Sequence, residues 1–365
     1  MRTAAMPFVA ARIAVGAALA VARELSSTGN LGSAAAGRAH QGLLGWDAGW
    51  YEAIARGGYS GAGHPSLRFF PVVPLLARGL AELPGVGVGL ALVVVANVSA
   101  LIGMALVAEL ARRETGDTSL ARRATWLLAM APPAFVLVMG YAEGTLLAFG
   151  AATFLALRNR RWGWAAGFGL LAGATRPLGV VLALPALIEV ASHAPRRHGW
   201  LRWPGGGPVA AVLAAPAGCG AYLAWVGWRY GNAFAPFSIQ QQGRHRGAVA
   251  DPLVTAAHDL SLLFHGRHLS QALHLPWLVL AAGLLLVVAC RWPASYAWFA
   301  GAVLAVAVTA SNLDGFERYA LSAFPLVLGG ATVTSSARVE RTVLTVAAAG
   351  LVGYAVLAFC NVYVP

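Results

Sequence analysis

Long apolar runs recur along the chain and constrain its fold more than any other feature. Residues 86–110, 124–157, 164–190 and 273–290 form continuous stretches rich in Ala, Leu and Gly. A helix needs about 20 mostly apolar residues to span a bilayer, and a continuous pattern favours helices over the alternating strands of a membrane barrel. Because 58% of the residues are hydrophobic and only 11% are charged, water-soluble domains are excluded. The sequence predicts an all-α, polytopic membrane protein.

The basic residues, all of them Arg, lie mostly in short gaps between the apolar runs, at 112–123, 158–161, 196–202, 291 and 338–341. Such gaps face the cytoplasm under the positive-inside rule. The net charge of +12 is therefore a topology signal and not a footprint for nucleic acid, which we exclude as a partner. The rule predicts about eleven transmembrane helices, with the N-terminus inside and the C-terminus outside.

This topology predicts a single integral membrane domain, 1–365, in the plasma membrane of a bacterium. The apolar stretch at 7–25 is expected to be a first anchor helix, with a cleaved signal peptide as the alternative. Two long polar regions would face outward: a first outer loop at 26–84, with short interfacial helices, and a second at 230–271. Loops of that length are usually functional when they are ordered.

Two of the apolar runs are too long for one helix and must contain a break. Residues 124–157 can turn at 140–144, and residues 164–190 can turn at 176–177, where a proline disfavours continued helix. Each half has about 13 to 17 residues, short for a full span, so these helices are expected to be re-entrant or enclosed by protein.

Ionisable side chains that interrupt apolar runs outside the Arg-rich gaps all fall on the predicted outer side. A charge at the bilayer centre costs about 2.5 to 3.5 kcal/mol on insertion scales, so such residues tend to face a cavity and mark a site. They are Asp47, Glu143, Arg176, Asp314, Glu317 and Arg318.

The densest polar stretch, residues 45–59, predicts a short helix that opens after Asp47. Trp50, Tyr51 and Ile54 would share one face of it and suit the membrane interface. Asp is also a preferred N-cap residue, so a purely capping role for Asp47 stays open beside a chemical one.

The same stretch resembles the first-loop signature of PIG-V-type mannosyltransferases, relatives of GPI mannosyltransferase II in the glycosyltransferase C superfamily. The residues that carry the resemblance are Trp46-Asp47, Trp50-Tyr51, Ile54-Ala55 and Gly58-Tyr59. Shorter pieces agree in order along most of the chain: Arg68-Phe69-Phe70-Pro71 with Pro74, Asn97, Tyr141-Ala142-Glu143, Gly173-Ala174-Thr175-Arg176-Pro177, Arg318-Tyr319 and Phe324-Pro325.

The resemblance implies a glycosyltransferase C-like fold and an enzyme that moves a sugar, mannose by family, from a polyprenyl-phosphate donor to an acceptor hydroxyl. In that superfamily an acidic residue of the first outer loop acts as the base, and Asp47 occupies the matching position. The transfer reaction requires the same kind of group, because a sugar hydroxyl is a poor nucleophile until a carboxylate takes its proton. A departing phosphate is stabilised by Arg.

Arg176 and Arg318 are the expected phosphate partners, because each follows an apolar helix and Arg grips phosphate through two hydrogen bonds. The alternatives are an interface anchor for Arg176 and, for Arg318, a local pair with Glu317 or Asp314. Glu143 could bind acceptor hydroxyls or form a structural ion pair with Arg176.

The remaining expected substrate contacts are Trp46, Tyr51, His64, Arg68 and Tyr319. His64 and Arg68 could line the donor entrance, although a solvated loop is an alternative for His64. The basic loop 240–246 is read as solvated by default or as a contact for acceptor or headgroups. Asp47 and Glu52 would point away from each other on a helix, so we predict catalysis without a bound metal. No other cofactor is expected, and the transferase hypothesis includes inversion at the anomeric carbon.

Two other functions stay open. The broken helices would also suit a transporter or flippase of a lipid-linked or anionic substrate, and a non-catalytic subunit of a glycan-assembly complex would look similar. A transporter is expected to carry repeats and charges reached from both faces; no repeat is visible, and the charges lie on one side. The sugar and the acceptor, whether glycan, glycolipid or protein, are not fixed by one sequence.

Overall fold

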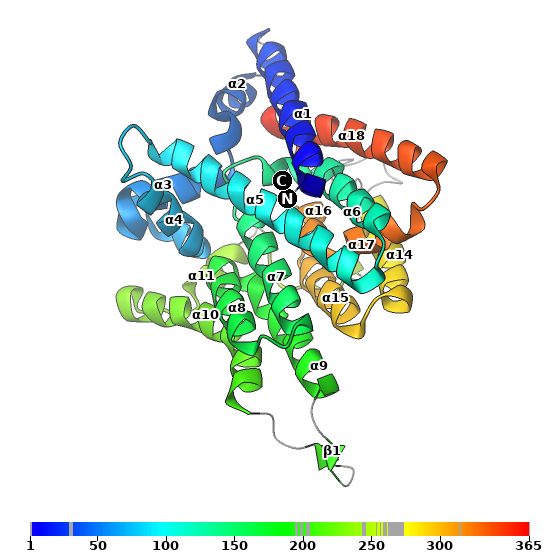
Figure 1. Cartoon of the computed structure of the whole chain (residues 1–365). Helices are drawn as coiled ribbons and strands as arrows, with labels where there is room; N and C mark the ends of the chain where they lie inside the picture. The colour runs from blue at the N-terminus through cyan, green and yellow to red at the C-terminus, as the bar shows by residue number, and fades with distance from the viewer. Residues whose placement is uncertain are drawn as a thin grey trace.

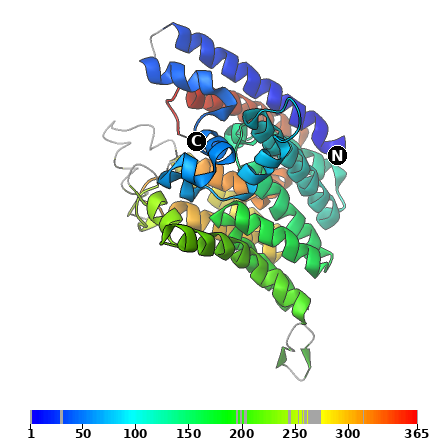
Figure 2. The ribbon, with the colours of Figure 1, turned by 90° about the vertical axis from the view of Figure 1, so that its left-hand side faces the viewer.

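A computed structural model describes residues 2–28, 32–193, 196–197, 200–201, 205–242, 246–252, 254–255, 257, 261, 274–313 and 315–364. Helices dominate this part of the chain (Figure 1). The one strand pair within it, β1 (Arg196–Arg197) with β2 (Trp200–Leu201), lies at the tip beyond α9 (Ala183–His193) and α10 (Gly206–Tyr230) in both ribbon views (Figures 1 and 2).

Four of the described helices are long and apolar enough to cross a membrane: α1 (Arg2–Ser27), α5 (Val88–Thr115), α10 and α18 (Ala337–Phe359). Apolar side chains on their outer faces are exposed, such as Ile13 at 67% and Val98 at 52%, as expected where lipid replaces water. Shorter apolar helices include α14 (Leu275–Arg291) and α15 (Ala294–Val308). The chain is a multi-pass membrane protein, whereas the total of about eleven spans stays a prediction.

Both long runs are interrupted as predicted, but the first interruption begins earlier than 140–144, because α6 ends at Met130, directly before Ala131 and Pro132. The first long run is divided into α6 (Thr118–Met130), the 3-10 turn η3 (Pro132–Leu137) and α7 (Glu143–Arg158). The second is divided into α8 (Trp162–Thr175), η4 (Pro177–Leu182) and α9. Glu143 therefore stands at the first turn of α7, and Arg176 stands between α8 and η4, so each break places a charge inside the protein.

Small residues allow the broken helices to pack closely. A side-chain carbon at Gly173 of α8 would overlap the backbone carbonyl of Ala215 in α10, and one at Gly144 of α7 would lie 2.6 Å from the carbonyl oxygen of Ala96 in α5. Close approach through small residues is the usual way in which membrane helices associate. These contacts fix the positions of the two breaks relative to α5 and α10.

The first loop is helical and packs against the bundle. Its elements are α2 (Gly32–Gln41), η1 (Gly42–Leu44), α3 (Asp47–Ala62), η2 (His64–Arg68) and α4 (Val72–Leu80). The expectation that Trp50, Tyr51 and Ile54 lie in the membrane interface is wrong for two of them, because Tyr51 and Ile54 are buried in the core. The ring of Phe69 stacks on Trp50 and meets Tyr51 edge-on at 5.1 Å, so the chain itself covers this face.

The remaining described helices are α11 (Ala235–Gln240), α16 (Phe316–Ser322) and α17 (Pro325–Val333). α1 packs along α18 and α6, and α16 contacts η3 and α7. Asn97 of α5 accepts a hydrogen bond from Arg12 of α1 and donates one to the Val138 carbonyl. The segment before α7 is thereby tied to two long helices.

Candidate active site

Asp47 is positioned by an unusual backbone turn at the start of α3. The preceding residue, Trp46, has φ 58° and ψ −129°, a region that non-glycine residues rarely occupy. Its indole nitrogen donates to the carbonyl of Ala358 in α18 at 3.0 Å, and Arg38 lies over its ring at 3.9 Å. Asp47 is the first residue of the helix and not its cap, so the purely capping interpretation is wrong. Its carboxylate is directed to another element.

Four charged side chains from separate elements form one chain of ion pairs. Arg318 of α16 donates to the Asp47 carboxylate at 2.5 Å, and its Nε lies 3.4 Å from Glu143 of α7. Arg176 pairs with the same oxygen of Glu143. The order is thus Asp47, Arg318, Glu143, Arg176, with alternating sign. Asp47 and Arg318 are 271 residues apart.

These side chains differ in their access to solvent. Glu143 is 3% exposed, Arg318 10% and Arg176 12%, whereas Asp47 is 28% exposed. Burial acts to raise the pKa of Asp47, but the nearby positive charge of Arg318 and two further arginines outweighs it and lowers that pKa. Asp47 is therefore the accessible, ionised carboxylate of the group, and Glu143 is the enclosed one.

The accessible end of this network opens into a cavity of about 440 Å³. Its charged lining consists of Asp47 and four arginines, Arg68, Arg176, Arg246 and Arg318. With Glu143 counted behind the wall, four guanidinium groups face two carboxylates. The wall keeps an excess of positive charge, which favours an anionic ligand.

Aromatic residues complete this wall. Arg68 lies over the ring of Phe69 at 4.7 Å, and Arg246 lies over Tyr319 at 4.2 Å while donating to the Ala307 carbonyl at 2.5 Å. Flat rings beside cations suit both a sugar face and a lipid phosphate.

A second, apolar cavity adjoins the same loop segment. It measures about 470 Å³ and is lined by residues of α3, α4, α8 and α10, among them Tyr59, Pro71, Tyr222 and Trp225. Phe69 and Phe70 line the charged cavity, and the next residue, Pro71, lines the apolar one. The two spaces therefore meet the chain at adjacent positions.

The structure brings most of the expected site residues together at the charged cavity: Trp46, Asp47, Tyr51, Arg68, Arg176, Arg318 and Tyr319. Glu143 stands behind its wall, paired with Arg176 as one of the two alternatives proposed. His64 is exposed and does not line the cavity, in keeping with a solvated loop.

The suggested local pair of Arg318 with Glu317 is wrong. Glu317 is buried, with His274 Nδ1 at 2.7 Å, and accepts a hydrogen bond from the hydroxyl of Tyr363 at 2.8 Å. Asp314 lies outside the described residues. Among the described residues, no group of three or more His, Cys, Asp or Glu side chains is placed to hold a metal ion.

Arg246 is a cavity residue outside the expected site residues. It belongs to the basic loop 240–246, for which solvation is the default expectation and a contact for acceptor or headgroups is the alternative, and Gln240 at the other end of that loop also lines the cavity. The signal was present in the run of polar residues, but nothing local separates a loop that folds over a site from one that extends into water.

Comparisons with known proteins address the fold. No protein-family model matches the chain, and a search of curated proteins found no match. The crystal structure of ArnT from Cupriavidus metallidurans bound to undecaprenyl phosphate aligns with a TM-score of 0.51 at 16% identity, over 87% of this chain and 72% of ArnT. The Archaeoglobus fulgidus oligosaccharyltransferase aligns at 14% identity with a TM-score of 0.43, over 81% of this chain but 45% of its own. The likeness to ArnT confirms the predicted all-α, glycosyltransferase C-like fold.

Proposed function

We propose that this chain is a membrane glycosyltransferase that moves a sugar from a polyprenyl-phosphate donor to an acceptor hydroxyl, with inversion and without a metal. The observation that carries the proposal is the meeting of Asp47 with four arginines at one cavity. An accessible carboxylate can take a proton, and the arginines can hold a phosphate. By its resemblance to PIG-V-type enzymes the sugar is mannose, and the acceptor is a glycan, glycolipid or protein.

The excess of positive charge supports a lipid phosphate as the leaving group. Arg68 of η2 and Arg246 of the loop after α11 line the cavity in addition to the two arginines of the ion-pair chain, Arg176 and Arg318. Undecaprenyl phosphate, the lipid bound to ArnT, has this chemistry. The apolar cavity beside Pro71 would accept the first isoprene units of such a donor.

Asp47 is assigned as the base. The Asp47 carboxylate accepts a hydrogen bond from Arg318, which keeps it ionised but weakly basic. A donor phosphate that accepts hydrogen bonds from Arg318 would compete for that guanidinium and free the carboxylate. Asp47 then takes the acceptor's hydroxyl proton while the oxygen attacks the anomeric carbon. The bond from that carbon to the phosphate oxygen breaks on the opposite face, and the lipid phosphate leaves with the electron pair.

The membrane side follows from the arginine pattern. Under the positive-inside rule the cavity opens on the outer face of a bacterial plasma membrane, where polyprenyl-linked sugars would meet their acceptors. This orientation is part of the proposal.

The test combines product analysis with a matched pair of variants. Purified protein is incubated with a panel of polyprenyl-phosphate sugars and membrane extract, and mass spectrometry identifies which molecule gains a sugar. Asp47→Asn should lower transfer by about 100- to 10,000-fold, the usual contribution of a general base. Glu52→Gln, on the same helix but paired with Arg56 near the surface, should leave it unchanged. Normal turnover by Asp47→Asn would show that Asp47 is not the base. If none of the donors in the panel supports transfer by the parent protein, the whole assignment is contradicted.

Transport is the alternative that the broken helices support. A cysteine placed at position 143 or 176 should react with polar reagents only from the outer side if the protein is a transferase. Reaction from the cytoplasmic side would favour transport.

A further inference from the structure

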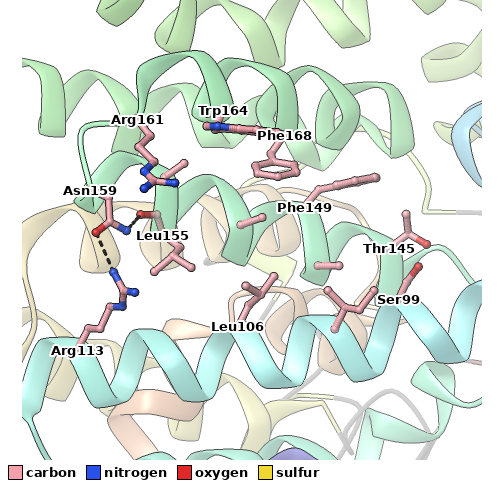
Figure 3. Close-up of a pocket in the computed structure, with 14 residues that line it drawn as sticks. Ser99, Leu106, Arg113, Thr145, Phe149, Leu155, Asn159, Arg161, Trp164 and Phe168 are labelled. Carbon is pink, nitrogen blue, oxygen red and sulfur yellow. Dashed lines mark hydrogen bonds between the residues drawn. The ribbon is translucent and has the colours of Figure 1, made fainter. Parts of the chain in front are cut away.

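A long apolar groove lies between α5, α7 and α8, separate from the charged cavity (Figure 3). It measures about 720 Å³, and none of its lining residues lines the charged cavity. Its floor is formed by Ala148, Ala152 and Ala156, which are four residues apart and so share one face of α7. Their small side chains leave a valley between the two flanking helices.

The walls of the groove are large apolar side chains. Ile102 and Leu106 come from α5, and Trp164 and Phe168 come from α8. Trp164 is 61% exposed and Ile102 is 39% exposed, so no described helix covers the valley. In a membrane protein this open face is in contact with lipid.

One end of the groove is basic. Figure 3 shows Arg113 and Arg161 reaching toward this end from the two walls, with Asn159 between them. Arg113 donates to Asn159 at 2.8 Å and pairs with Glu109. In the described part of the chain no acidic side chain forms an ion pair with Arg161, and its guanidinium is exposed. A cation without a counter-charge therefore stands at the mouth of an apolar channel.

The other end of the groove is marked by Ser99 and Thr145. The Thr145 hydroxyl is buried and makes no hydrogen bond to a described residue. From Arg113 to Ser99 the α5 helix rises about 21 Å at 1.5 Å per residue. One leaflet contributes roughly 15 Å of hydrocarbon, so the valley is long enough to hold a lipid chain from the interface to the bilayer centre.

We propose that this groove binds an anionic phospholipid of the leaflet at its basic end, with the headgroup phosphate at Arg161 and Arg113 and one acyl chain along the alanine floor. The planar guanidinium of Arg can donate two hydrogen bonds to one phosphate. A zwitterionic headgroup also carries a positive charge, which the arginines would repel, so an anionic headgroup is favoured. Exposed arginines near a membrane surface attract anionic lipid in this way. The site is independent of the proposed transfer reaction, because it lies in a different cavity.

Native mass spectrometry of the purified protein tests this site. The protein is titrated with phosphatidylglycerol or phosphatidylcholine, and the apparent dissociation constant of the first lipid is measured. Phosphatidylglycerol should bind more tightly, and Arg161→Gln should weaken it by roughly fivefold. The control is Arg160→Gln, which removes the same charge from an exposed neighbour that does not line the groove and should leave binding unchanged.

A second variant tests the apolar part of the site. Ala152→Phe fills the middle of the floor and should weaken phosphatidylglycerol binding while leaving both arginines in place. Three results would overturn the proposal: equal binding of the two lipids, equal losses in Arg160→Gln and Arg161→Gln, or unaltered binding in Ala152→Phe. A dimer mass that excludes lipid would likewise overturn it, since a second protein would then occupy the groove.

Discussion

The buried carboxylate of Glu143 offers a direct test of how the ion-pair chain is held together. Glu143→Gln keeps the shape of the side chain but removes the negative charge that pairs with both Arg176 and Arg318. Both guanidinium groups are at least 88% buried by side-chain area, and Asp47 is already bonded to Arg318. Arg176 would then be left without a counter-charge.

The expected loss follows from that geometry. Breaking a buried pair by removing one partner costs about 3 to 5 kcal/mol. At roughly 2 °C per kcal/mol for a large chain, the melting temperature of the purified protein should fall by about 6 to 10 °C. Glu52→Gln is the control, because its pair with Arg56 is near the surface and contributes at most about 1 kcal/mol.

A double variant measures the coupling between Glu143 and Arg176 directly. Adding Arg176→Gln to Glu143→Gln removes the orphaned charge, so the double variant should be more stable than Glu143→Gln alone, with a coupling of about 2 to 3 kcal/mol. Thermal unfolding followed by intrinsic fluorescence measures the parent, the single variants Glu143→Gln and Arg176→Gln, and the double variant. A Glu143→Gln variant that melts within about 1 °C of the parent, or a double variant whose losses simply add, would refute the account.

Two further predictions concern packing and pH. Gly173→Ala places a carbon against the backbone of α10 and should lower the free energy of unfolding by about 1 to 3 kcal/mol, seen as a lower melting temperature. Gly167→Ala is the control, because the added carbon meets no atom within 4 Å and should leave the melting temperature unchanged. The lowered pKa of Asp47 lies below its ordinary 3.8, so this base stays ionised as pH falls from 8 to about 5, and its activity and ion-pair stabilisation are lost only at lower pH. A pH–rate profile for transfer would contradict this if the base-limited arm had its midpoint near pH 6.

The local parts of the architecture were predictable from sequence. Gly and Pro break a helix through their own backbone chemistry, so the interruptions of the two long apolar runs could be predicted without knowing their surroundings. Asp47 could also be identified from its neighbours in the sequence alone, since it is a carboxylate flanked by aromatic residues in the first loop.

Contacts between distant segments could not be predicted in this way. Nothing near Arg318 indicates that it bonds to Asp47 and not to Glu317, because that choice depends on how α16 packs against η3 and α7. Arg246 is outside the expected site residues for a related reason. Its loop resembles many solvated loops, and only the folded chain places its guanidinium over Tyr319.

The pairing of Glu143 with Arg176 also bears on how the protein is made. Glu143 is the first residue of α7 and Arg176 directly follows the last residue of α8, so the two meet when these consecutive helices form a hairpin. Entering lipid separately, each charge would cost about 2.5 to 3.5 kcal/mol, whereas the hairpin enters as an electrically neutral unit. In a membrane-insertion assay the isolated hairpin should insert less efficiently with Glu143→Gln than with the native pair, and equal efficiency would contradict this. Each of the two charges alone would hinder insertion, but as a pair they allow α7 and α8 to enter the membrane together.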